Sequence, residues 1–157
     1  MRFKEEKRSI VQLIRLCEKK ELLPAVIFVF SKKKISELAE AFMSQRGFKL
    51  IDSRTENIII NFFDRAVHRL KPQDRKSPQL IKLRELVRYG VAMHHGGLLP
   101  IAKEIVEMLF SEGLIKVLLA TETFAMGINM PTKTVIFHSI DKYDNNGLRM
   151  LHSSEYT

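Results

Sequence analysis

The residues best suited to bind an anion lie in a loop that follows a long apolar run. From Leu114 to Ala120 only Lys116 interrupts the apolar residues, a pattern typical of a parallel strand covered on both faces. Open α/β sheets bind ligands at the carboxyl ends of such strands, because the loops there can point backbone N–H groups at an anion. Thr121 and Thr123 add hydroxyl donors suited to phosphate oxygens. The residues alone leave two readings open, a phosphate-binding loop and an ordinary polar turn.

Two further residues of this loop suit close contact with a partner. Gly127 removes the side chain at a point where a ligand could approach the backbone, and Asn129 carries both a donor and an acceptor. A second candidate loop, His95-Gly96-Gly97, follows the short apolar segment 91–94 and would also free peptide amides for contact. Without further information, this second loop could equally be a flexible turn.

The order of residues in these segments resembles a known family. Thr121–Pro131 reads TETFAMGINMP, with HHGGLLP before it at 94–100 and KTVIF after it at 133–137. Together they closely resemble the second RecA-like domain of the Ski-like DExH RNA helicases, superfamily 2 enzymes that feed RNA to the exosome. The first segment looks like motif V of that family. Its eleven residues match in order, which is far more specific than a lone Gly-rich pattern.

The resemblance covers almost the whole chain and implies a fold and a function. It implies one α/β domain over residues 1–157, a three-layer RecA-like (P-loop NTPase-type) domain with a mainly parallel sheet flanked by helices. It also implies a family-specific helical insertion at about 52–88, and it indicates that the region of motif VI is not included. The function implied is the RNA-backbone-binding and nucleotide-cleft half of an ATP-dependent 3′-5′ RNA helicase in exosome-linked RNA processing or decay.

The resemblance assigns roles to residues of three loops. RNA-binding roles fall on Ser31, Lys32, His95, Gly96, Thr121, Glu122 and Thr123, and ATP-cleft roles on Gly127 and Asn129. Ser31 follows an apolar strand directly, so it could instead only cap the next helix. Both roles are compatible, because a cap uses one acceptor whereas an anion uses the free amides of the first turn.

The sequence holds no complete machinery for phosphoryl transfer. It contains no G-x-x-x-x-G-K-[ST] phosphate loop, no Asp-Glu-x-His segment and no Arg-rich motif after Glu155-Tyr156. We therefore expect no catalytic residue and no metal ligand here, and no ATP hydrolysis or RNA unwinding by these 157 residues alone. ATP and Mg²⁺ would be bound mainly by the first RecA-like domain of a longer protein.

The expected partners are single-stranded RNA, held by sequence-independent backbone contacts, the first RecA-like domain of the same protein, and exosome accessory proteins. Two alternatives remain open at this stage. One is the same domain of a Ski-like DNA repair helicase, and the other is a non-catalytic RecA-like interaction module.

Charge and composition are compatible with a polyanion-binding protein. Residues 1–88 carry 21 Lys or Arg against 11 Asp or Glu, a net of +10, while residues 89–157 carry a net of −2. This basic excess permits binding to RNA through counterion release, although a solvated basic surface would look the same. The single cysteine excludes an internal disulfide. We find no signal peptide and no membrane-spanning run, and we expect an intracellular protein, in the nucleus in preference to the cytoplasm.

Periodicity predicts the elements that position these loops. We expect helices at about 9–20, after Ser31, at 52–71, at 78–90 and from Pro100, the third opened by a capping box of Ser53 and Glu56. We expect a ragged start over residues 1–8, and strands at 25–30, 91–94, 114–120 and 134–138. Asn146-Gly147 predicts a turn that joins 143 to 148.

Overall fold

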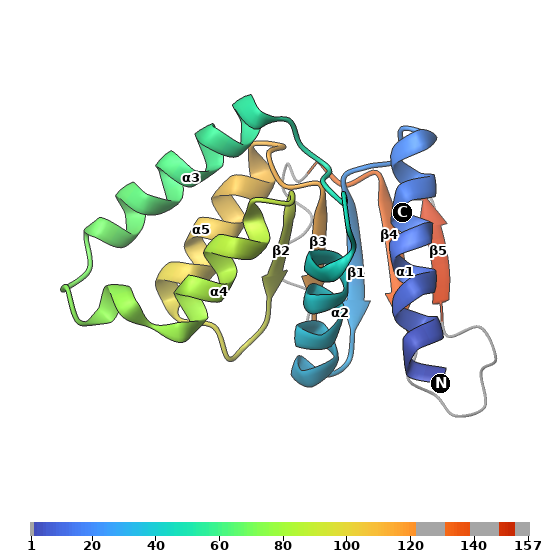
Figure 1. Ribbon diagram of the computed structural model, residues 1–157, viewed down its shortest axis with the longest axis horizontal. Coiled ribbons are helices and arrows are strands. Elements are labelled where there is room, and N and C mark those ends of the chain that lie inside the picture. Colours follow the sequence, from blue (N-terminus) through green and yellow to red (C-terminus); the bar gives the residue numbers. More distant parts are fainter. Residues whose placement is uncertain (1, 122–130, 139–147, 153–157) are drawn as a thin grey trace.

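A mainly parallel sheet forms the centre of the computed structural model, which describes residues 2–121, 131–138 and 148–152. The described strands are β1 (Ala25–Val29), β2 (Val91–His94), β3 (Val117–Ala120), β4 (Thr134–His138) and β5 (Leu148–His152). They lie in the order β2-β3-β1-β4-β5, with β1 to β4 parallel and β5 antiparallel to β4 at the edge (Figure 1). The predicted boundaries of β2 and β4 are confirmed.

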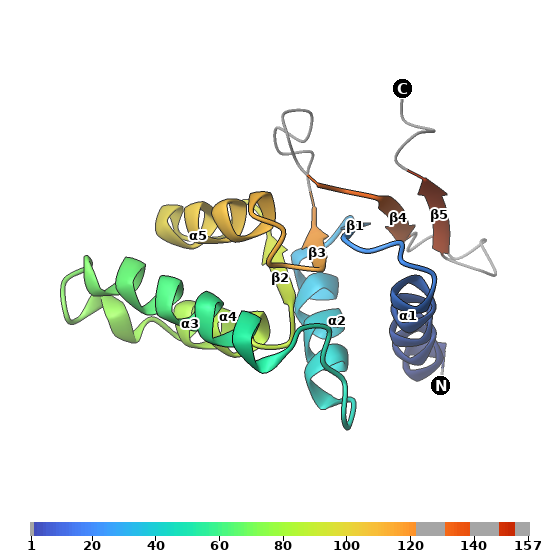
Figure 2. The same ribbon diagram turned by 90° about the horizontal axis from the view of Figure 1, so that it is seen from above.

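Helices cover both faces of the sheet. They are α1 (Arg2–Lys19), α2 (Lys32–Ser44), α3 (Ser53–His68), α4 (Pro78–Val87) and α5 (Pro100–Ser111), with a short 3₁₀ turn η1 (Asp74–Lys76). Figure 2 shows α1 and α2 on one face and α5 on the other, while α3 and α4 extend beyond the β2 edge. This is the expected α/β, three-layer RecA-like arrangement.

The core explains why the strands read as continuous apolar runs. Every residue of β1, β2 and β3 is buried, because helices pack on both faces of this part of the sheet. The predicted inner face of α2 is confirmed by the buried side chains of Ile35, Leu38, Ala39 and Phe42. Of the helices described, none is long and apolar enough to cross a lipid bilayer.

Three sequence predictions about local structure are wrong. Strand β1 ends at Val29, and Phe30 is 71% exposed, because Phe30 lies beyond the last residue of β1 that pairs with a neighbouring strand among residues 2–121, 131–138 and 148–152. The strand predicted from Leu114 begins only at Val117. The predicted ragged start is instead helical from Arg2.

The start of α3 also differs from the prediction. Asp52 is the N-cap, and its side chain accepts a hydrogen bond from Thr55 N at 2.8 Å, so Ser53 is already inside the helix. Glu56 does not close a capping box but pairs with Lys49 and Arg88. These contacts hold the pKa of Glu56 below its ordinary value, chiefly through the hydrogen bond from Lys49.

Candidate nucleic-acid interface

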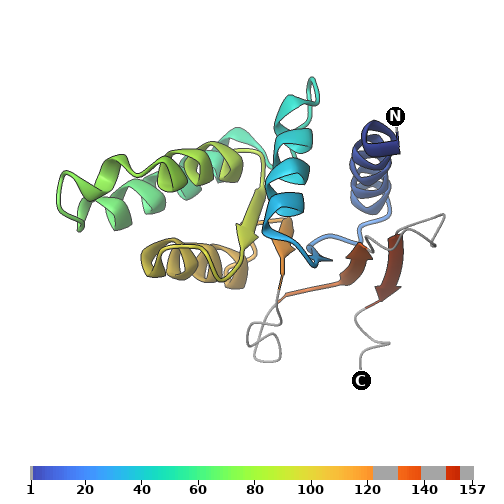
Figure 3. The same ribbon diagram turned by 90° about the horizontal axis from the view of Figure 1, so that it is seen from below.

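The three predicted RNA-binding loops begin at the carboxyl ends of three neighbouring strands, on the same side of the sheet. In the strand register, Phe28 of β1 and His94 of β2 both lie opposite Ala120 of β3. Ser31, His95 and Thr121 follow these strands directly or within three residues, so they emerge together at the carboxyl ends. Figure 3 shows the three strands from below, side by side. We call this edge the carboxyl rim. It is the edge at which parallel sheets present ligand-binding loops.

Ser31 caps α2, as one of the two readings predicted. Its Oγ accepts a hydrogen bond from Lys34 N at 3.3 Å. The hydroxyl proton remains available for donation, because a serine hydroxyl carries one donor besides its lone pairs. The first-turn amides of Lys32 and Lys33 have no acceptor within an α-helix, so this helix start can donate to an anion in addition to being capped.

His95 is held as a neutral acceptor within its own loop. Its Nδ1 accepts a hydrogen bond from Gly97 N at 3.0 Å, and its backbone oxygen accepts from Leu98 N at 3.1 Å. Partial burial lowers the pKa of His95, and the electrostatic effects of Lys32, His94 and Lys103 lower it further. At neutral pH the ring therefore carries its proton on Nε2, which makes it a donor. Gly96, next along the loop, is exposed.

Lys32 lies against the His95 loop although it comes from another segment. Its Nζ is 3.3 Å from the point that a Cβ would occupy on Gly97, and two atoms of the His95 ring are 3.2 Å from the same point. Because Gly97 has no Cβ, Lys32 Nζ and the His95 ring can both approach this point. The structure thus brings together two predicted residues, Lys32 and His95, that are separated by more than sixty positions.

Thr121 joins the same rim and has an unused polar group. Its backbone N–H donates to His94 O at 3.3 Å, which links the ends of β3 and β2. Its Oγ1 is buried and has no hydrogen-bond partner among the residues that the structure describes. An unpaired buried hydroxyl costs about 1–3 kcal/mol, so a ligand that accepts its hydrogen bond would recover that energy.

Four predicted site residues lie outside the described residues. These are Glu122 and Thr123, assigned to RNA, and Gly127 and Asn129, assigned to the ATP cleft.

Two residues that the sequence analysis did not select also reach the carboxyl rim. Lys103, in the first turn of α5, is close enough to His95 to act on its pKa. Its position in the first turn of the helix that follows the His95 loop could have predicted this from the sequence. Gln79 of α4 binds the backbone of that loop through its side chain, and nothing in its sequence context indicates this contact.

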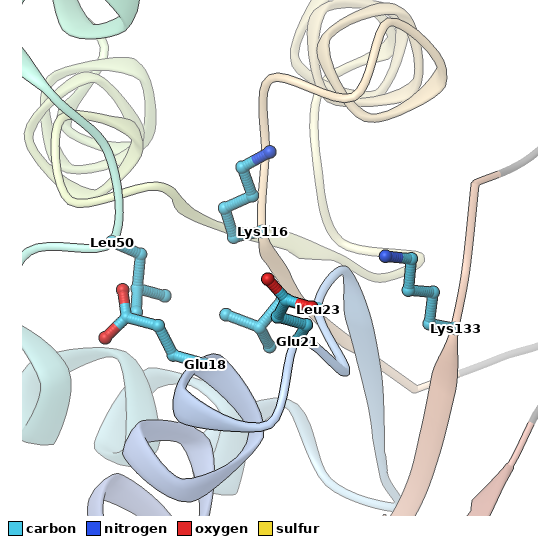
Figure 4. A pocket seen from close by; sticks show the side chains of 6 residues that line it. All are labelled: Glu18, Glu21, Leu23, Leu50, Lys116 and Lys133. Atoms are coloured by element: carbon cyan, nitrogen blue, oxygen red, sulfur yellow. The ribbon is translucent and has the colours of Figure 1, made fainter.

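A cavity of about 380 Å³ lies at the opposite edge of the sheet (Figure 4). It is lined by Glu18, Glu21, Leu23, Leu50, Lys116 and Lys133. Three of these lie within two residues of the amino-terminal ends of β1, β3 and β4, so the cavity is separated from the carboxyl rim by the length of the strands. Among these lining residues, Lys116 donates a hydrogen bond from Nζ to Gly113 O at 2.9 Å.

Within residues 2–121, 131–138 and 148–152, no group of three His, Cys, Asp or Glu side chains is placed to hold a metal ion. The groups that meet at the carboxyl rim are hydroxyl groups, amides and cationic side chains, a set that suits phosphate oxygens.

Known proteins resemble this chain over nearly its full length. Residues 6–154 match the family described as helicase conserved C-terminal domain. The antiviral helicase SKI2 of Saccharomyces cerevisiae is 50% identical over 151 residues, which are 96% of this chain and 12% of that protein. Human superkiller complex protein 2 is 48% identical over 134 residues, 85% of this chain and 10% of that protein.

A third relative is an RNA helicase by its name. The ATP-dependent RNA helicase mtr4 of Schizosaccharomyces pombe is 39% identical over 148 residues, 94% of this chain and 13% of that protein. The chain thus spans about an eighth or less of the length of these relatives. From the match of residues 6–154 to the family model, the chain belongs to the helicase conserved C-terminal domain family.

Proposed function

We propose that this chain is the RNA-backbone-binding and nucleotide-cleft half of an ATP-dependent 3′-5′ RNA helicase that acts in exosome-linked RNA processing or decay. The observation that supports it most is the convergence of Ser31, Lys32, His95 and Thr121 on one rim, where Thr121 Oγ1 is buried and unpaired among the described residues. Membership of the helicase conserved C-terminal domain family supports a role of that rim in a helicase.

The groups at the rim suit the backbone of a nucleic acid. The hydroxyl groups of Ser31 and Thr121, the amides at the start of α2 and the charge of Lys32 can each contact phosphate oxygens. Such contacts fix the position of a strand without reading its sequence, which is what a motor that moves along RNA requires. Glu122 and Thr123 would extend this surface.

The chemical step would be completed by another part of the longer protein. ATP supplies the free energy for movement when its terminal phosphate is transferred to water. We propose that its phosphates and Mg²⁺ are held mainly by a first RecA-like domain, with Gly127 and Asn129 of this chain facing the shared cleft. Opening and closing of the two domains would then move a strand gripped at the carboxyl rim.

The partners that follow are RNA, the first RecA-like domain and accessory proteins of the exosome. We favour RNA over DNA as the bound strand, because one of the relatives named above is an ATP-dependent RNA helicase. We place the longer protein inside the cell, in the nucleus ahead of the cytoplasm.

A test compares two substitutions in the longer protein that contains this chain. Thr121→Ala should lower the RNA-stimulated ATPase rate more than the basal rate, because it removes a contact to RNA. Asn129→Ala should lower both rates, because it faces the nucleotide. Lys20→Ala, at an exposed lysine between α1 and the amino-terminal end of β1, is the control and should leave both unchanged. Equal losses from Thr121→Ala in both rates, or stronger stimulation by DNA than by RNA, would contradict the proposal.

A further inference from the structure

One side chain of α4 grips the loop that carries His95. Gln79 Nε2 donates a hydrogen bond to Gly97 O at 3.0 Å, and Gln79 Oε1 accepts one from Leu99 N at 2.7 Å. The planar carboxamide therefore uses a donor and an acceptor on the backbone of the same loop. Two bonds from one rigid group fix orientation as well as distance.

Gly97 is bound from two sides by this arrangement. Its carbonyl oxygen binds Gln79, and its N–H donates to His95 Nδ1 at 3.0 Å. The bond to the carboxamide sets the direction of the peptide that follows Gly97, and the bond to the imidazole sets the ring of His95. The position of His95 and of the exposed Gly96 is thereby tied to Gln79.

The helix that carries Gln79 is itself firmly placed. Leu80, Leu83, Leu86 and Val87 of α4 are buried in the core. Arg84 adds a two-point ion pair with Asp64 of α3, at 2.8 and 3.0 Å. The carboxamide thus extends from a helix that cannot shift without disturbing the core, whereas the loop that it binds is largely exposed apart from Leu98.

We propose that Gln79 is a positioning residue for RNA binding: it holds the 95–99 loop in the geometry in which His95 and Gly96 contact the strand. This inference rests on the proposed function, because it assumes that the carboxyl rim binds RNA. Helix α4 would thus take part in the RNA site through its hydrogen bonds to the 95–99 loop. Gln79 itself does not contact phosphate.

The test measures the affinity of the longer protein for a single-stranded RNA at several salt concentrations. Gln79→Ala should weaken binding about tenfold, because the loop must then be ordered when RNA binds. The slope of log affinity against log salt should stay as in the wild type, since no phosphate contact is lost. Lys32→Ala should instead reduce that slope by about one. Gln73→Ala, an exposed glutamine just before η1, is the matched control and should bind like the wild type.

A second variant and a second measurement guard against misfolding. Gln79→Met keeps the length of the side chain but removes both hydrogen bonds, and it should reproduce the tenfold loss. In both variants the Leu99 amide should exchange its hydrogen faster. Wild-type affinity in folded Gln79→Met, or a reduced salt slope in either variant, would overturn the inference. If Lys32→Ala changed neither affinity nor slope, the proposed function would fail, and this inference with it.

Discussion

His95 is the titratable residue on which the rim depends most. Burial and the neighbouring charges of Lys32, His94 and Lys103 lower its pKa below the ordinary 6.5. The neutral ring accepts from Gly97 N, and protonation of Nδ1 would remove that bond. The geometry of the rim is therefore coupled to the protonation state of one imidazole.

This lowered pKa predicts a direction for stability against pH. The pKa of His95 is lower in the folded chain than in the unfolded chain. At pH values between the two, the unfolded chain binds more protons, so the free energy of unfolding decreases as pH falls below about 6.5. The unfolding temperature should therefore drop from pH 7.5 to pH 5.5, and the drop should be smaller in His95→Asn, whose side-chain oxygen can still accept from Gly97.

The control for this titration is Gln73→Ala, which changes an exposed side chain just before η1 and removes no titratable group. It should keep the pH dependence of the wild type. An unchanged drop in His95→Asn would show that the imidazole at the rim does not supply the effect.

Among the elements, the turn between α4 and β2 has the least room for change. Gly90 has a φ of +85°, and a Cβ there would lie 3.0 Å from Ile51 Cγ2 and 3.2 Å from Leu50 Cβ. Gly113, between α5 and β3, has a φ of +75° but nothing within 4 Å of an added Cβ. The two glycines share a left-handed backbone and differ in crowding.

The matched substitutions separate these two costs. Gly113→Ala should lower the free energy of unfolding by about 1–2 kcal/mol, the cost of a left-handed alanine. Gly90→Ala should add about 1–3 kcal/mol for overpacking, because Ile51 and Leu50 must move. Denaturant unfolding of both variants measures the difference. Equal losses would mean that the α4–β2 turn accommodates a methyl group.

Helix α4 is anchored by its buried leucines more than by its ion pair with α3. Leu83 is fully buried, while Arg84 and Asp64, which pair across the two helices, have side chains that are 41% and 53% exposed. Such an exposed pair is worth about 0.2–1 kcal/mol, whereas truncation of a buried leucine costs about 2–5 kcal/mol.

A mutant series can rank these contributions. Leu83→Ala should lower the free energy of unfolding by about 2–5 kcal/mol. The coupling energy from a double-mutant cycle of Arg84→Ala and Asp64→Ala should stay below about 1 kcal/mol. Ile81→Ala, at a 60% exposed position of the same helix, is the control for truncation on α4 and should cost far less than Leu83→Ala. A coupling energy larger than the Leu83 loss would reverse the ranking.

Sequence periodicity predicted the individual elements well and their contacts poorly. The strands at 91–94 and 134–138 and the start of α5 at Pro100 were predictable, because apolar patterns and a helix-opening proline are local signals. The end of β1 was not, because Phe30 continues the apolar run but pairs with no strand in the part of the chain that the structure describes. The bond from Gln79 to Leu99 joins segments twenty residues apart through a polar side chain, and a single sequence holds no pattern for it.

On the scale of the whole molecule, the proposed RNA site and the cavity lie at opposite ends of the strands of one sheet. The carboxyl rim gathers Ser31, Lys32, His95 and Thr121, which come from three separate loops. The opposite edge carries the cavity between Glu18 and Lys133. The proposed RNA strand should therefore contact the first edge and leave the second unchanged.

Hydrogen exchange with and without RNA tests this division most directly. In the longer protein, bound single-stranded RNA should slow amide exchange at residues 31–35, 95–99 and 120–121, because these amides lie at the carboxyl rim. Residues 18–23 and 131–134 at the opposite edge should exchange at the same rate in both states. Protection at the opposite edge, or unchanged exchange at the rim with RNA bound, would contradict the account.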